Sequence, residues 1–472
     1  MQILKSIFVV FEVLMLFNLL IFVHELGHFL AAKWRGMKVE RFAIWFGKPI
    51  WKKTIGGVEY ALGSIPAGGY VSLPQMAPME IIEGKTDSTA AALPTVSALD
   101  KIIVAVAGPL FSFLLAVFFA VIVWGVGRPM DEADKTTTIG WVDSTGPAAK
   151  AGLQPGDKIL EVDGHPVTQF MSGSSDSVVW RVVTSEGSTI EIKYLRDGKE
   201  AVVHAVPFHK QTAWYERKAM RQLQIAPADD VMISDLATNG PAKEAGLKEG
   251  DRVVALNGKK IYHFQAIVDA QSSATNAPPK AEIFTVERGT NQFNYSVMAV
   301  KPLRPADAKP SFGILGLQGS SNIVIMHPTP ASQIEASFAQ ITGTIRALFS
   351  RKSEIGVQQL GGAILIIRVY KNMFENENGW RMVLWFSVIM NVNLALLNML
   401  PFPVLDGGHI TLALLELVRR RPVSAIVLQY LQTACAVALI GLMLFLAFFD
   451  SVDWARSSGK THDEPIVFAP KK

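Results

Sequence analysis

The sequence predicts a mixed membrane protein, with four transmembrane α-helices and a large extramembrane part built mainly of β-strands between the second and third. Composition is the first reason, because 50% of the 472 residues are hydrophobic and only 18% are charged. That balance is too apolar for a purely soluble chain and too polar for one that lies wholly in the membrane. The other reasons are four long apolar segments and an internal repeat.

The four apolar segments each offer roughly the twenty residues that a spanning helix needs. They are residues 3–32, 102–127, 381–400 and 424–449. The first is expected to be retained rather than removed as a signal peptide, because no small-residue cleavage site follows it.

Basic residues set the expected orientation of these spans. Those that closely follow the first span are Lys33, Arg35, Lys38, Arg41, Lys48, Lys52 and Lys53. Only Lys5 precedes that span, and three arginines (419–421) lie between the third and fourth. The positive-inside rule therefore places loops 33–100 and 401–423 in the cytoplasm, and both termini and residues 128–380 outside.

Charge and cysteine usage exclude two further classes. The net charge of +4 is spread without a long basic run, so nucleic-acid binding has no support. Cys435 is the only cysteine, which excludes a disulfide within the chain and a cysteine-rich metal site.

The pentad His24-Glu25-Leu26-Gly27-His28 lies inside the first span. Histidines four residues apart share one face of a helix, with about 5–6 Å between their Cβ atoms, so both can bind one zinc ion. Glu25 is then placed to take a proton from metal-bound water. The alternative is an interhelical hydrogen-bonding cluster, but three ionisable side chains at membrane depth need a compensation such as a metal.

A third ligand is expected from another segment at similar depth, because catalytic zinc usually has three protein ligands. Pro401 and Pro403 forbid a regular helix after the third span, and such backbone is tolerated there only where it is packed in protein or lines a cavity. Asp406, followed by two glycines, is the predicted ligand, and His409 is the fallback. Asp406 could instead be a turn or N-cap residue.

Asn398 precedes this proline segment and has two possible roles. Its amide could hydrogen-bond the substrate backbone or a developing oxyanion. It could equally make an interhelical hydrogen bond, and the spacing does not separate the two.

The repeat lies between the second and third spans. Residues 146–164 recur at 240–258, an offset of 94 residues, and each copy reads as a short helix, a Gly-Asp turn and a β-strand. The pattern resembles PDZ domains of bacterial proteases, which can bind extended peptides by strand addition. Two roles stay open for the pair: capture of a peptide C-terminus, or restriction of access to the membrane site.

Taken together, these motifs resemble the site-2 protease family of intramembrane zinc metalloproteases. The resemblance covers nearly the whole chain and includes Ala107-Gly108-Pro109 at the second span and the NxxPxPxxDG pattern of 398–407. It implies that Zn²⁺ is held by His24, His28 and Asp406. The other family positions are the general base, Glu25, and the substrate-contact residues, Asn398, Pro401 and Pro403. Ser112 departs from the family, which often has Asn there.

The family's biology sets further expectations. Its substrates are transmembrane segments already shortened by an upstream site-1-type protease, typically an anti-sigma factor, and also remnant signal peptides. A bacterial inner-membrane location with periplasmic PDZ domains is implied. Residues 39–73 look like the family's membrane-associated β-hairpin, whose edge could pair with an unwound substrate; a plain cytoplasmic hairpin is the alternative.

The expected domain order follows from these observations. In chain order, the expected segments are span one (1–34), the hairpin loop (35–100), span two (101–127), two PDZ domains (128–223 and 224–303), strands and amphipathic helices (304–379), span three (380–400), the Asp406 loop (401–423), span four (424–449) and a tail (450–472). The rival class is a membrane scaffold or metal transporter. A transporter would need more ionisable residues along the spans, and a scaffold leaves Glu25 without a purpose.

Overall fold

The computed structural model describes residues 2–76, 96–171, 174–273, 280–305, 308–319, 323–376, 378–419, 425–458 and 466–469. Arg420 and Arg421, used in the topology prediction, lie outside the described residues. The chain forms two compact units. The first comprises Met1–Pro129, Met326–Thr342 and Leu360–Val452, and the second Met130–Ile325, Gly343–Gln359 and Asp453–Lys472.

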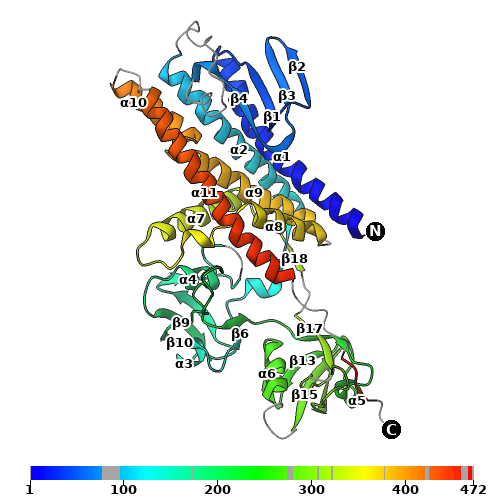
Figure 1. The fold of residues 1–472 in the computed structure, drawn as a ribbon. Coiled ribbons are helices and arrows are strands. Elements are labelled where there is room, and N and C mark those ends of the chain that lie inside the picture. Colours follow the sequence, from blue (N-terminus) through cyan, green and yellow to red (C-terminus); the bar gives the residue numbers. More distant parts are fainter. Residues whose placement is uncertain are drawn as a thin grey trace. The chain divides into compact units, whose positions relative to one another are not determined.

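Among the described residues, four helices are long and apolar enough to cross a membrane, as the sequence predicts. They are α1 (Gln2–Trp34), α2 (Ala98–Val126), α9 (Gly379–Asn398) and α11 (Ala425–Ser458). Helix α2 contacts α1, α9 and α10 (Asp406–Arg419), and Figure 1 shows it running beside α1. Residues from α2 therefore reach the inner faces of three other helices.

The ends of α2 are defined by ordinary capping chemistry. The Ser97 hydroxyl accepts the Asp100 N–H at 3.1 Å, which satisfies one of the free amides of the first turn. Asp100 also accepts from the Arg35 Nε at 2.6 Å, which joins the start of α2 to the residue after α1. At the other end, Gly127 adopts a φ of 77° and donates to the Val123 carbonyl.

The segment predicted as a hairpin is larger than a hairpin. Its strands are β1 (Arg41–Phe46), β2 (Trp51–Ile55), β3 (Val58–Leu62) and β4 (Ile65–Ser72). They form one sheet in the order β2-β3-β1-β4, in which β2 and β3 make the hairpin around Gly56-Gly57. The sheet packs on α1, where the Phe42 ring lies 5.2 Å from the Phe29 ring. A short 3-10 helix, η1 (Pro74–Met76), follows.

The second unit holds two β-domains built on one plan. The first uses β6 (Ile139–Val142), α3 (Pro147–Lys150), β7 (Lys158–Val162), β8 (His165–Pro166), α4 (Val178–Thr184), β9 (Ile190–Arg196), β10 (Lys199–Ala205) and β11 (Ile225–Pro227). The second uses β12 (Met232–Leu236), α5 (Pro241–Ala245), β13 (Arg252–Leu256), β14 (Lys259–Lys260), α6 (Gln265–Ser273), β15 (Ala281–Arg288), β16 (Asn291–Met298) and β17 (Ile314–Gln318).

Strand order repeats between the two domains. The first contains β10-β9-β7-β8 and the pair β11-β6, and the second contains β16-β15-β13-β12-β17 with β14 on β13. Strand β11 pairs with β6 and β17 pairs with β12, and these two strands lie after residues 223 and 303, where the domains are expected to end. The sequence repeat covers only the central motif, so it could not reveal these late strands.

The aspartate of the repeated Gly-Asp pair binds an arginine in both β-domains. The Asp157 carboxylate accepts the Gln154 amide and binds Arg196 at 2.6 Å, and Arg196 also donates to the Gly152 carbonyl. In the second copy, Asp251 binds Arg288 at 2.6 Å in the same arrangement. Each aspartate is almost fully buried, so the arginine compensates its charge.

The remaining elements connect the two units along the chain. Strands β5 (Arg128–Asp131) and β18 (Ile323–Met326) pair, and η3 (Glu132–Lys135) follows β5. Helix α7 (Pro330–Phe349), η4 (Val357–Gln359) and α8 (Ala363–Glu375) occupy the segment where the sequence has apolar residues at helical spacing. The Asp450 carboxylate of α11 accepts the Leu365 amide at 3.0 Å and so caps α8.

Candidate metal centre

Helix α1 supplies the two histidines of the pentad on one face, as their spacing predicts. The His24 and His28 Nε2 atoms are 3.3 Å apart, and both residues are only 8% exposed. Glu25 is half-buried on the same turn. Its Cγ lies beside β4, since a Cβ placed on Gly69 would be 3.3 Å away from it.

Asp406 comes from the first turn of α10 and points at both imidazoles. Its Oδ2 lies 3.2 Å from the His24 Nε2, and its Oδ1 lies 3.3 Å from the His28 Nε2. One ligand atom from each of the three residues falls within 4.8 Å of the others. The geometry thus brings together the three residues that the sequence selects as a metal site, from segments almost 380 residues apart.

Contacts at Nδ1 fix how the imidazoles face the cluster. The His28 Nδ1 lies 2.8 Å from the Val104 carbonyl oxygen, which can only accept, so this nitrogen carries the proton. The His28 Nε2 lone pair then faces the Asp406 carboxylate. The His24 Nδ1 lies 3.0 Å from the Ser112 hydroxyl, which can accept in the same way.

These contacts fit a bound cation. A nitrogen lone pair and a carboxylate oxygen repel one another unless a positive charge lies between them. Among the described residues, the Asp406 Oδ2 is buried and has no hydrogen-bond partner, as expected of an atom reserved for a metal. Two imidazoles and one carboxylate are also a known ligand set of catalytic zinc, with a position left open for water.

Two glycines let α1 and α2 approach closely at this site. A Cβ on Gly108 would overlap the His28 imidazole, and a Cβ on Gly27 would overlap the Ala107 carbonyl. The Ala-Gly-Pro stretch of α2 therefore carries a steric requirement, because only glycine leaves room for the histidine ring.

The segment between α9 and α10 is irregular, as its two prolines predict. A Cβ on Gly407 or Gly408 would overlap the Met399 or Phe402 carbonyl oxygens, respectively, so both glycines are needed for this turn. The Pro403 carbonyl accepts from the Gln432 Nε2 of α11 at 3.4 Å. Gln432 is 1% exposed, and it links the fourth candidate span to the segment that positions Asp406.

The other predicted residues lie at different distances from the cluster. The Asn398 Nδ2 at the end of α9 is 3.5 Å from the His24 Nε2, which places its amide at the site. Pro401 is exposed and Pro403 half-buried in the segment before Asp406. His409 is buried on α10 but does not belong to the group of three.

Sequence reasoning missed two contributors. The sequence identifies Ser112 only as a departure from the family pattern, although its hydroxyl contacts His24 and its side chain is fully buried. The sequence analysis assigns no role to Gln432. A polar residue inside an apolar span was the available signal for both.

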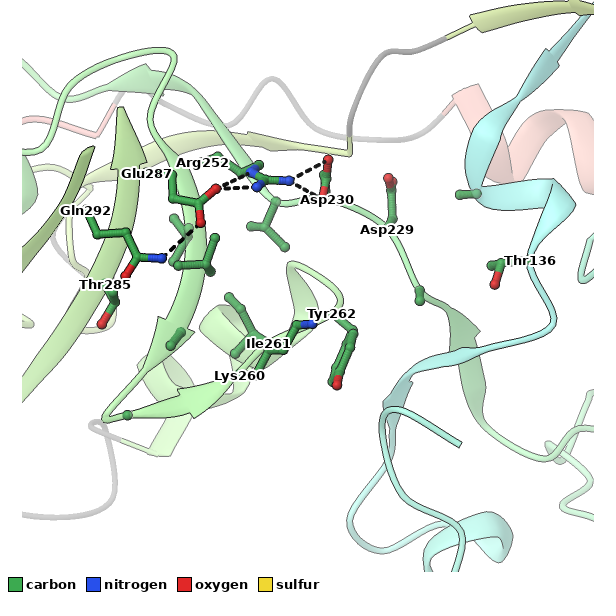
Figure 2. A pocket seen from close by; sticks show the side chains of 17 residues that line it. Thr136, Asp229, Asp230, Arg252, Lys260, Ile261, Tyr262, Thr285, Glu287 and Gln292 are labelled. Atoms are coloured by element: carbon green, nitrogen blue, oxygen red, sulfur yellow. Dashed lines mark hydrogen bonds and ion pairs between the residues drawn. The ribbon is translucent and has the colours of Figure 1, made fainter. Parts of the chain in front are cut away.

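A hollow of about 840 Å³ in the second unit offers no rival centre (Figure 2). Arg252 there binds both Glu287 and Asp230, and Gln292 donates to Glu287. These charged groups are satisfied by one another, and the described residues of the lining include no histidine or cysteine.

Comparisons with known proteins agree with this site. The model of Peptidase family M50 matches residues 12–442. A Vibrio cholerae relative, whose name assigns it to the zinc metalloproteases, is 29% identical over 470 residues, covering 92% of this chain and 96% of the relative. The "Regulator of sigma E protease" of Haemophilus influenzae is 27% identical over 461 residues, and "Protease RseP" of Yersinia pestis is 26% identical over 473. Each of these two alignments covers 91% of this chain and 96% of the relative.

The site and the four apolar helices define a multi-pass membrane metalloprotease that uses zinc. The chain belongs to Peptidase family M50.

Proposed function

We propose that this chain is an intramembrane zinc endopeptidase that cleaves the transmembrane segment of single-span proteins. The convergence of His24, His28 and Asp406 carries the proposal, because two of the three lie within a candidate span. A metal site within a membrane span can act on peptide bonds inside the bilayer, which soluble proteases cannot reach.

In this proposal each residue of the site has a distinct role. His24, His28 and Asp406 hold the ion, which supplies Lewis acidity for water and for a carbonyl group. Glu25, beside His24, accepts the proton of the attacking water and passes it to the leaving amine. Asn398 donates its amide hydrogens to the substrate or to the developing oxyanion.

Strand β4 is the proposed docking edge for the substrate. Among the described strands, β4 pairs with β1 alone, so it is an edge strand of its sheet. It also passes beside Glu25 at Gly69. A helix hides its carbonyls in internal hydrogen bonds, and pairing with β4 would hold the unwound segment extended for attack. Pro401 and Pro403 are proposed to contact the same segment.

The setting of the reaction is proposed from the charge pattern and the relatives. The basic loops favour a metal site near the cytoplasmic side of a bacterial inner membrane, with both termini and the β-domains in the periplasm. The two β-domains are proposed to be PDZ modules that restrict access to substrates already shortened by an upstream protease. An anti-sigma factor is one proposed substrate, and the name of the Haemophilus influenzae relative, a regulator of sigma E, supports this choice.

Substitution of Glu25 tests the proposal. Glu25→Gln keeps the size of the side chain but cannot accept a proton, so we expect normal zinc content and loss of cleavage of a single-span substrate. The measurement pairs metal analysis with cleavage by the full-length protein in lipid vesicles. Glu12→Gln, elsewhere on α1, is the matched control and should cleave normally. Cleavage at the unsubstituted rate by Glu25→Gln would reject the mechanism.

A further inference from the structure

An aromatic pair occupies the tip of a turn in the first β-domain. The Glu216 amide donates to the Ala213 carbonyl at 2.9 Å, which places Trp214 and Tyr215 at the two central positions. Their rings contact edge to face at 5.6 Å, and Trp214 is 87% exposed. Such positions normally hold Gly, Asn, Asp or Pro, so folding of the turn does not explain two large aromatic residues.

The same turn is bound to the end of a candidate membrane span. Glu216 forms an ion pair with Arg456, and the Arg217 Nε lies 2.7 Å from Asp453 Oδ2. Arg456 and Asp453 belong to the last turns of α11, whose apolar span ends at Arg456. Residues 216 and 217 therefore contact the last turns of that helix.

The composition of the surrounding loop is that of a membrane interface. Lys210 and Lys218 are exposed on either side of the turn, and Trp454 on α11 is 45% exposed. Trp and Tyr concentrate at the headgroup level of bilayers, where their rings are half in apolar surroundings. Nearby lysines are attracted to anionic headgroups.

We infer that residues 208–220 form an interfacial anchor, in which Trp214 and Tyr215 enter the phospholipid headgroup region around the end of α11. The partner is the bilayer surface itself, rich in anionic phospholipid. The ion pairs hold the turn beside the end of α11, and the aromatic pair attaches the first β-domain to the membrane. This role is independent of the proposed proteolysis.

Depth-dependent quenching tests the anchor in the full-length protein. Cys435→Ser removes the native cysteine, and Gln211→Cys carries a fluorophore three residues before Trp214. The vesicles contain phosphatidylethanolamine, phosphatidylglycerol and a lipid with a nitroxide on its headgroup. We expect strong quenching at position 211 and weak quenching at a control site, Val202→Cys on β10, which is exposed in the same domain.

Removal of the aromatic pair completes the test. Trp214→Ser with Tyr215→Ser leaves the Glu216–Arg456 contact in place, and most of the quenching at position 211 should be lost. Equal quenching at positions 211 and 202, no quenching at 211, or quenching that survives the double substitution would each overturn the anchor. Because no cleavage is measured, failure here would leave the proposed protease activity untouched.

Discussion

His24 and His28 each use Nδ1 for a contact inside the protein and direct Nε2 at Asp406. The partners of Nδ1 therefore orient two of the proposed ligands. The Val104 carbonyl belongs to the backbone and cannot be removed by substitution, whereas the Ser112 hydroxyl can.

Ser112→Ala tests this second layer of contacts at the residue scale. Loss of the hydroxyl frees the His24 ring to rotate, and such changes typically lower metal affinity by about 10–100-fold. Competition with a zinc chelator measures the affinity directly, without any cleavage assay. Ser387→Ala is the matched control, because Ser387 is equally buried but contacts Tyr370. The same loss of affinity in both variants would show that Ser112 has no specific role.

At the scale of elements, the site depends on close packing between α1 and α2. Gly108 allows that packing, because a side chain there would occupy the space of the His28 ring. Gly407 and Gly408 at the start of α10 have a similar role beside Asp406. A side chain at Gly407 or Gly408 would overlap the Met399 or the Phe402 carbonyl oxygen, respectively.

Gly108→Ala should displace His28 or separate the two helices, and zinc content should fall strongly as a result. Gly125→Ala, on the same helix, is the control, since among the described residues no atom beyond the adjoining backbone of its own helix lies within 4 Å of the added methyl group. Metal analysis of both purified variants gives the comparison. If Gly108→Ala binds a full equivalent of zinc, the close approach that we describe is not required.

For the whole molecule, the sequence predicts a large part of the architecture from simple physics. Four apolar segments become four long helices, and His24, His28 and Asp406 meet as their residue types and depth require. Apolar length and i, i+4 spacing are local signals, so a single sequence carries them well.

Other features depend on partners that are distant in the chain. Strand β1 pairs with both β3 and β4, and this pairing extends the β2-β3 hairpin into a sheet. The register of such pairs depends on strands that are not neighbours along the chain, so a local sequence pattern does not reveal it. Strands β11 and β17 return to their sheets over long connections. The contact of Gln432 with Pro403 joins α11 to the segment between α9 and α10, and although Gln432 is a polar residue in an apolar span, its sequence neighbourhood does not identify its partner.

The central claim is that one zinc ion joins α1 to the segment after α9 through Asp406. Zinc content of the purified full-length protein with Asp406→Ala, compared with Glu25→Gln, tests it most directly. We predict that Asp406→Ala loses most of its zinc, because two imidazoles alone leave the ion incompletely held, whereas Glu25→Gln keeps a full equivalent. Unchanged zinc in Asp406→Ala would contradict the account and remove Asp406 from the metal site.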